Sequence, residues 1–183
     1  MAFILSLFLA NTGQYASAKA NKYASIIVDA DSLEILHARK IDAERYPASL
    51  TKMMTLYLTF DALENGQVRL REPLDISARA ARTPAVKLGL KAGGTITTEQ
   101  AILALSVRSA NDAAIVLAER LGGSTEEFAN KMTAKAKALG MRSTVFKNPH
   151  GLPDAGQITT ARDMAKLAQA LLQNHAKYYP YFS

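Results

Sequence analysis

The fold is decided by residues 46–60, YPASLTKMMTLYLTF, which predict a helix that is apolar on nearly every side. The helix is expected to begin near Ala48 or Ser49, because the preceding Pro47 needs no partner for a backbone N–H. It is expected to end at Asn65-Gly66, where a left-handed residue can close it. A helix that is apolar all round is normally buried. We therefore expect this helix to run through the core.

Two polar residues, Ser49 and Lys52, stand at the start of this helix. Residues three apart share one face of a helix. A mostly buried lysine loses solvation, its pKa falls, and its neutral amine can take a proton from a neighbouring hydroxyl. Lowering a lysine pKa from about 10.4 to near 7 corresponds to about 4 to 5 kcal/mol. Ser49 is thus a candidate nucleophile and Lys52 its base; the alternative is that Ser49 caps the helix and Lys52 points to water.

Composition restricts the classes of function that are open to the chain. Its 183 residues, 49% of them hydrophobic, suffice for one domain with a real core. The formal net charge of +6 is scattered, without a basic run or an aromatic platform, so nucleic acid is not an expected partner. The absence of cysteine excludes disulfides and thiol chemistry. Metal-ligand spacing is not seen around His37, His150 and His175, so we predict no metal, no cofactor and no Ser-His-Asp triad.

The N-terminus resembles an export signal. Residues 2–10 form a short apolar run, and Ala16-Ser17-Ala18 fits the small-residue rule for cleavage. The run is too short to span a bilayer. We predict a signal peptide over residues 1–18, although the usual positive charge before the apolar run is absent. The alternative is a terminal helix that packs on the domain.

The rest of the chain predicts one undivided α/β domain with a small sheet and many helices. A hairpin is expected from strands at residues 24–30 and 34–38. Its turn contains Leu33, an unfavourable residue if a positive φ is required. Residues 77–94 are expected to form a loop with short pieces of structure. Capping motifs and periodicity predict the helices at residues 101–107, 110–121, 124–139 and 161–173.

A second polar cluster, Ser109-Ala110-Asn111, lies at the joint between two of these helices. A hydroxyl in such a joint could relay a proton, and an amide could hold a substrate carbonyl or orient Lys52. The alternative is that Ser109 caps the second helix, with Asp112 at the third helical position.

The order Ser49-x-x-Lys52 followed by Ser109-x-Asn111 is that of the serine penicillin-recognising enzymes. From residue 23 to the C-terminus the chain closely resembles the D-alanyl-D-alanine carboxypeptidases, the low-molecular-mass penicillin-binding proteins. The segments that carry the resemblance are residues 46–55, 87–90, 109–114, 138–141, 148–152 and 159–164.

The resemblance implies a β-lactamase/transpeptidase-like α/β fold, of which this chain holds a helix-rich part with an N-terminal β-hairpin. It also implies removal of the terminal D-alanine from peptidoglycan stem peptides. Ser49 would be the acyl-ester nucleophile and provide one oxyanion N–H, and Lys52 would be its general base. Ser109 would relay the proton to the leaving D-alanine, and Asn111 would position the substrate amide and Lys52.

Partners and location follow from the same resemblance. The expected ligands are stem peptides ending in D-Ala-D-Ala, with β-lactam antibiotics as inhibitors. The expected location is the periplasm or cell envelope, with a catalytic domain over residues 19–183. Membrane association is expected only through a tail that these residues do not contain.

One departure from the family pattern concerns its third motif, Lys-Thr-Gly, which has no match in the sequence. We therefore expect a domain that lacks its C-terminal sheet strands and is a poor catalyst, since losing one oxyanion donor costs about a hundred- to a thousandfold in rate. A class A β-lactamase is an alternative, but it needs a glutamate in the loop at residues 148–157, where only Asp154 is acidic. A non-catalytic module that binds the cell wall is another.

Overall fold

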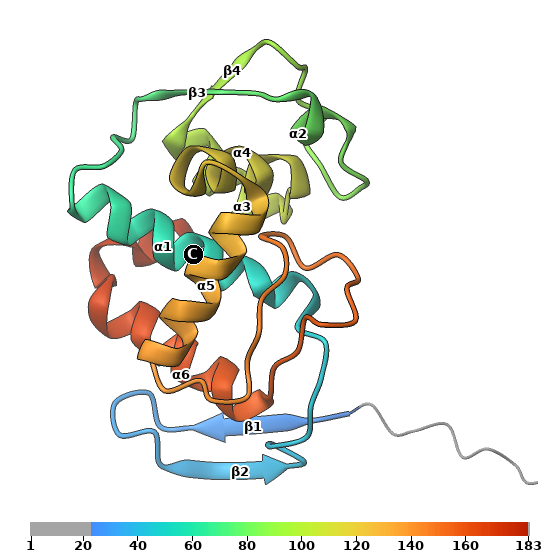
Figure 1. Ribbon diagram of the computed structural model, residues 1–183. Helices are drawn as coiled ribbons and strands as arrows, with labels where there is room; N and C mark the ends of the chain where they lie inside the picture. The colour runs from blue at the N-terminus through green and yellow to red at the C-terminus, as the bar shows by residue number, and fades with distance from the viewer. Residues whose placement is uncertain (1–22, 183) are drawn as a thin grey trace, which may run out of the picture.

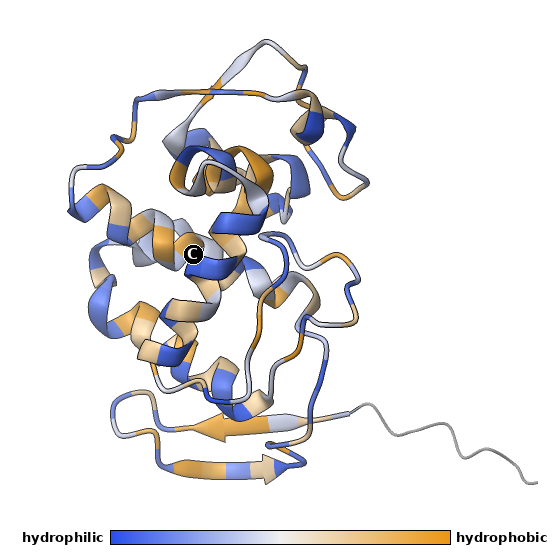
Figure 2. Ribbon diagram, viewed as in Figure 1, coloured by the Kyte–Doolittle hydropathy of each residue, from blue (hydrophilic) through white to orange (hydrophobic). Residues whose placement is uncertain are grey.

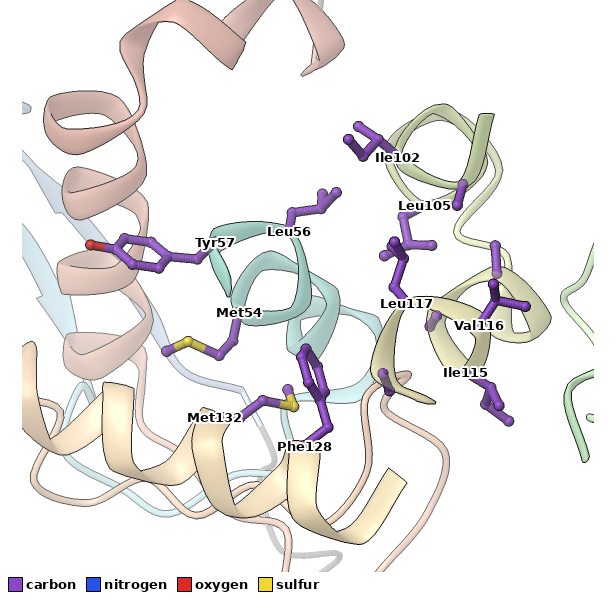
Figure 3. Packing of buried hydrophobic residues seen from close by; sticks show 14 of the residues in the cluster. Met54, Leu56, Tyr57, Ile102, Leu105, Ile115, Val116, Leu117, Phe128 and Met132 are labelled. Carbon is purple, nitrogen blue, oxygen red and sulfur yellow. The ribbon is translucent and has the colours of Figure 1, made fainter. Parts of the chain in front are cut away.

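The computed structural model describes residues 23–182, so the predicted signal peptide lies outside the described residues. Its centre is α1 (Thr51–Glu64), which other helices surround (Figure 1). Met54, Leu56 and Tyr57 leave α1 in different directions and are all buried (Figure 3). The prediction of a core helix is therefore confirmed. The α-helix itself begins at Thr51, because Ala48–Leu50 form a short 3-10 helix, η1.

Four further helices enclose α1, and local capping signals fix where three of them begin. Thr97 and Gln100 form a capping box with hydrogen bonds in both directions. Ser124 and Thr160 each accept a hydrogen bond from a backbone N–H of the first turn. Apolar side chains of these helices pack around α1, among them Ile102, Leu117 and Phe128 (Figure 3). The four helices are α3 (Thr98–Arg108), α4 (Asn111–Gly122), α5 (Thr125–Ala138) and α6 (Ala161–Asn174).

The predicted hairpin is confirmed as β1 (Ser25–Val28) and β2 (Ile35–Arg39), which pair antiparallel, and β1 lies against α6 (Figure 1). Leu33 in its turn has a φ of 59°, a left-handed conformation that costs a leucine free energy. Apolar residues run along both strands (Figure 2), and Ile27 and Leu36 are 57% and 63% exposed.

Between α1 and α3 the chain is mostly irregular, with turns and short pieces of regular structure. The sequence did not predict the second antiparallel pair, β3 (Pro73–Asp75) with β4 (Thr95–Thr97), because each strand is only three residues long. The short helix α2 (Ala78–Arg82) lies within the predicted loop. No helix within residues 23–182 combines the length and the apolar character needed to cross a membrane.

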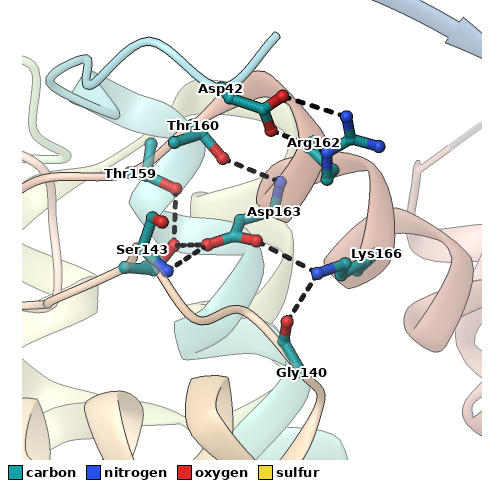
Figure 4. A network of polar contacts seen from close by, with 9 residues as sticks. Asp42, Gly140, Ser143, Thr159, Thr160, Arg162, Asp163 and Lys166 are labelled. Atoms are coloured by element: carbon teal, nitrogen blue, oxygen red, sulfur yellow. Dashed lines mark hydrogen bonds and ion pairs between the residues drawn. The ribbon is translucent and has the colours of Figure 1, made fainter.

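A buried carboxylate joins the start of α6 to the end of α5. Asp163 accepts hydrogen bonds from the Ser143 N–H and the Thr144 hydroxyl, both at 2.8 Å (Figure 4). Its other oxygen lies 3.3 Å from the Lys166 ammonium, which also donates to the carbonyl of Gly140. This network holds the segment after α5 on α6 and so fixes where the following loop begins.

The last described residues form a second 3-10 helix, η2 (Ala176–Phe182), which aromatic contacts hold on α1. Tyr178 stacks on Phe60 with ring centroids 4.4 Å apart. Just before η2, the buried His175 places its Nδ1 3.1 Å from Glu64 and its Nε2 3.2 Å from Asp61. The C-terminal end of the described residues is therefore packed on α1.

Candidate active site

Ser49 lies exposed in η1, directly before α1. It caps neither helix: the N-cap residues are Pro47 for η1 and Leu50 for α1, and neither makes a side-chain capping bond. The alternative in which Ser49 is a helix cap is therefore wrong. Its hydroxyl belongs to no cap and is accessible to a substrate.

Lys52 is buried, with 4% of its surface exposed, although it stands one turn from an accessible serine. Its Nζ donates a hydrogen bond of 2.6 Å to the main-chain oxygen of His150. Desolvation lowers the pKa of Lys52 to about 8. About one lysine in ten is then neutral at pH 7, against fewer than one in a thousand for a free lysine. The alternative in which Lys52 points to water is wrong.

The loop that receives Lys52 is fixed on α1 by a second hydrogen bond. The Thr55 hydroxyl donates to the main-chain oxygen of Pro149 at 2.6 Å, so two side chains one turn apart bind two successive carbonyls. His150 could not be recognised as part of the site from its residue type, because its contribution is a backbone atom. A polar stripe of Lys52, Thr55 and Thr59 along an otherwise apolar helix was the signal for such a contact.

Gly151 allows the same loop to approach the serine. Its φ is 90°, and a Cβ built on it would overlap the main-chain carbonyl of Ala48. Its N–H donates to the side-chain oxygen of Asn148 at 2.7 Å. Only glycine combines this conformation with so close a contact. The loop thus touches the residue that precedes Ser49.

The joint between α3 and α4 differs from the capping arrangement considered as an alternative. Ser109 closes α3 in a left-handed conformation, with φ at 52°. The N-cap of α4 is Ala110, which makes no side-chain cap bond, so the proposed Ser109 cap is wrong. Asn111 is 4% exposed; its N–H donates to Val86 at 2.8 Å, and its Nδ2 donates to the Pro84 carbonyl at 3.2 Å.

Asp112, the next residue, is fully buried and holds the loop that flanks Asn111. One carboxylate oxygen accepts from the N–H groups of Leu88 and Ala113, both at 3.0 Å. The other accepts from Gly89 at 2.9 Å and Leu90 at 3.1 Å. Asp112 was expected only as part of a helix cap, but in the structure its carboxylate positions a loop.

Replacing this carboxylate by an amide is expected to loosen the loop. In Asp112→Asn, either orientation of the amide turns an NH₂ group toward two N–H donors. Because hydrogen bonds to charged groups contribute about 1.5 to 3 kcal/mol each, we expect a loss of about 3 kcal/mol in the free energy of unfolding, measured with urea. The exposed Asp154 accepts one N–H, from Gly156, so Asp154→Asn should change stability by less than about 0.5 kcal/mol. Equal stabilities of the two variants would contradict this function of Asp112.

The four predicted site residues thus fall into two neighbouring groups. Ser49 and Lys52 lie with the loop at 149–151, and Ser109 and Asn111 lie with the segment at 84–90. Pro84 and His150, which bind Asn111 and Lys52, line the same cavity, so the two groups are adjacent. Among the described residues, no three histidine, aspartate or glutamate side chains gather in a group able to hold a metal ion.

Solved structures define the class of protein. The chain is similar to the carboxypeptidase DacD of Francisella tularensis, with a TM-score of 0.86 and 37% identity over 91% of this chain and 40% of that one. It is also similar to penicillin-binding protein D2 of Listeria monocytogenes in its ampicillin-bound form, with a TM-score of 0.77 and 31% identity over 86% and 64% of the two chains. The fold is therefore that of the penicillin-binding DD-carboxypeptidases, as predicted.

The particular family follows from the sequence comparisons. Residues 10–183 match the D-alanyl-D-alanine carboxypeptidase family, and the chain belongs to it. Carboxypeptidase DacF of Bacillus subtilis (strain 168) is 34% identical over 174 residues, which are 94% of this chain and 45% of the relative. The chain thus spans less than half the length of this relative.

Proposed function

We propose that the chain is the part of a serine-type D-Ala-D-Ala carboxypeptidase that forms the acyl-enzyme at Ser49. The observation that carries this proposal is the buried Lys52, whose pKa of about 8 makes a neutral amine available near an exposed serine. Membership of the carboxypeptidase family supports the substrate class, a peptide ending in D-Ala-D-Ala.

The proposed reaction assigns one step to each polar group. Neutral Lys52 takes the hydroxyl proton of Ser49, and Oγ attacks the carbonyl carbon of the penultimate D-alanine. The Ser49 N–H stabilises the oxyanion that forms. Ser109 passes a proton to the nitrogen of the terminal D-alanine as the peptide bond breaks. Water then hydrolyses the ester and restores the serine.

Asn111 is proposed to bind the substrate amide through its side-chain oxygen. Its Nδ2 already donates to the carbonyl of Pro84, which sets the orientation of the amide group. The oxygen then remains to accept a hydrogen bond from the substrate or from Lys52. Burial of Asn111 in the first turn of α4 keeps this atom in place.

We further propose that the mature protein begins near residue 19 and works in the cell envelope, where peptidoglycan stem peptides are available. The support is the composition of residues 1–18 and the family of the chain. β-Lactams, which mimic the acyl donor, are the proposed inhibitors. The ampicillin-bound structure of the Listeria relative supports their binding by proteins of this kind.

The rate of acylation should depend on pH through Lys52. Burial depresses its pKa, and only the neutral amine can accept a proton, so the rate should rise with pH and level off above about 8. Below that value the rate should fall about tenfold per pH unit. Rates of penicillin labelling between pH 5.5 and 9.5 measure this dependence. A rate that is independent of pH over this range would contradict Lys52 as the base.

Release of D-alanine tests the proposed activity. An N-acylated peptide ending in D-Ala-D-Ala is incubated with the chain and with Ser49→Ala, and free D-alanine is quantified over time. We expect release by the wild-type chain only, and none from a peptide ending in L-Ala-L-Ala. Equal release by Ser49→Ala would contradict the proposal. Hydrolysis of penicillin faster than of the peptide would favour the β-lactamase alternative.

A further inference from the structure

The two loops that bind Lys52 and Asn111 form part of the wall of a cavity of about 410 Å³. Pro84 and His150 form part of its wall while their main-chain oxygens accept hydrogen bonds from Asn111 and Lys52. Pro84 therefore lies between the cavity and Asn111, and His150 lies between the cavity and Lys52. Its volume lies in the range of ordinary small-ligand sites, about 300 to 1,000 Å³. The lining comes from the end of α2, from α4, from the start of α5 and from residues 147–152.

The cavity carries more positive than negative charge. Its one lining carboxylate, Glu126, is bound to Arg79 at 2.7 Å, and this hydrogen bond lowers the pKa of Glu126 to about 2. Two other lining cations, Arg82 and Lys147, are exposed and make no ion pair within the part of the chain that the structure describes. The lining therefore offers two cations to an incoming anion and already binds one carboxylate of the chain itself.

His150 adds a neutral hydrogen-bond donor to these charges. Its Nδ1 accepts the N–H of Leu152 at 3.1 Å, so the proton of the neutral ring resides on Nε2. Burial, with a contribution from the charge of Lys52, lowers the pKa of His150 to about 4. The ring is consequently neutral at physiological pH and presents Nε2–H as a donor.

We propose that this cavity is a binding site for the carboxylate of an acidic peptide, held by Arg82, Lys147 and the His150 Nε2–H. Guanidinium and ammonium groups form the strongest hydrogen bonds with carboxylates, and a ring N–H adds direction. The choice of a peptide rests on the proposed function, because the neighbouring site would act on peptides. Inorganic phosphate shares the oxyanion chemistry and is the other source to distinguish.

An occupied cavity would also affect Lys52. A negative charge beside His150 favours the protonated forms of both His150 and Lys52, so it raises both pKa values. Less neutral Lys52 would then be available at a given pH. The peptide would thus shift the onset of acylation toward higher pH, an effect that is separate from competition for Ser49.

Binding is tested on the full chain by following the His150 ring nitrogens in NMR titrations. The probes are N-acetyl-glutamate and N-acetyl-glutamine, both as their α-amides so that the glutamine probe is neutral, and inorganic phosphate. The variant Arg82→Gln/Lys147→Gln removes the two unpaired cations. The matched control Lys137→Gln/Arg142→Gln makes the same change in net charge with exposed residues that do not line the cavity.

We expect N-acetyl-glutamate to bind at least tenfold more tightly than either other probe. The cavity variant should lose at least tenfold in affinity, the control less than twofold, and saturation should raise the pKa of His150. Equal binding of N-acetyl-glutamine, or equal losses in the two variants, would overturn the site; equal binding of phosphate would overturn the peptide assignment. The titration on Ser49→Ala should give the same affinity, so the result does not depend on acylation at Ser49.

Discussion

Lys52→Met is expected to reduce acylation by penicillin at least a thousandfold while the chain remains folded. The variant keeps the unbranched apolar part of the side chain but removes the amine that accepts the Ser49 proton, and a serine without an adjacent base is a weak nucleophile. When residues act as a unit, loss of one can remove most of the rate. The main-chain oxygen of His150 loses its donor, which costs about 1 to 3 kcal/mol of stability.

The measurement is the second-order rate of labelling by a fluorescent penicillin, together with urea unfolding. Lys135→Met is the matched control, because Lys135 lies on α5 and pairs with Asp61 at 2.9 Å, away from Ser49. That control should label at nearly the wild-type rate. Labelling of Lys52→Met within tenfold of wild type would show that another group activates Ser49.

Gly151→Ala is expected to lower the free energy of unfolding by about 3 kcal/mol or more. The left-handed conformation alone costs an alanine about 1 to 2 kcal/mol. In addition, the new Cβ would overlap the main-chain carbonyl of Ala48, and backbone atoms cannot move aside as a flexible side chain can. For a chain of this size the loss corresponds to a fall in Tm of about 6 to 12 °C.

Gly66→Ala separates the two causes. Gly66 also has a positive φ, 68°, but a Cβ there would have no heavy atom within 4 Å. We therefore expect Gly66→Ala to cost only about 1 to 2 kcal/mol in thermal or urea unfolding. Displacement of the loop by Gly151→Ala should also slow acylation, because Ala48 precedes Ser49. Equal stability losses in the two variants would contradict the close contact between the loop and η1.

The helices could be predicted from the sequence because their signals are local. Thr97 with Gln100, Ser124 and Thr160 each define a helix start within four residues, and the structure has them as expected. The short strands β3 and β4 could not be predicted, since a three-residue strand has too few residues to show a period. For Leu33 the sequence indicated only that a leucine is unfavourable if the turn requires a positive φ, and the structure has that φ.

The residues of the candidate site could be predicted from the sequence, but the contacts that hold them in place could not. Ser49, Lys52, Ser109 and Asn111 stood out by type and spacing, and resemblance to the carboxypeptidases supplied their roles. The groups that hold them are non-local: the His150 oxygen comes from 98 positions away, and Asp112 binds N–H groups 22 to 24 positions earlier. The side-chain partner of such a contact can leave a pattern, as the polar stripe on α1 does, but the backbone partner cannot be identified from a single sequence.

The intact mass of the chain after incubation with a penicillin tests whether Ser49 is a reactive nucleophile. We predict a stoichiometric adduct with the mass of the intact antibiotic, located at Ser49 by peptide mapping and absent from Ser49→Ala. This result would show that residues 23–182 assemble a reactive serine. A folded chain that forms no adduct, or an adduct that persists in Ser49→Ala, would contradict Ser49 as the nucleophile of this site.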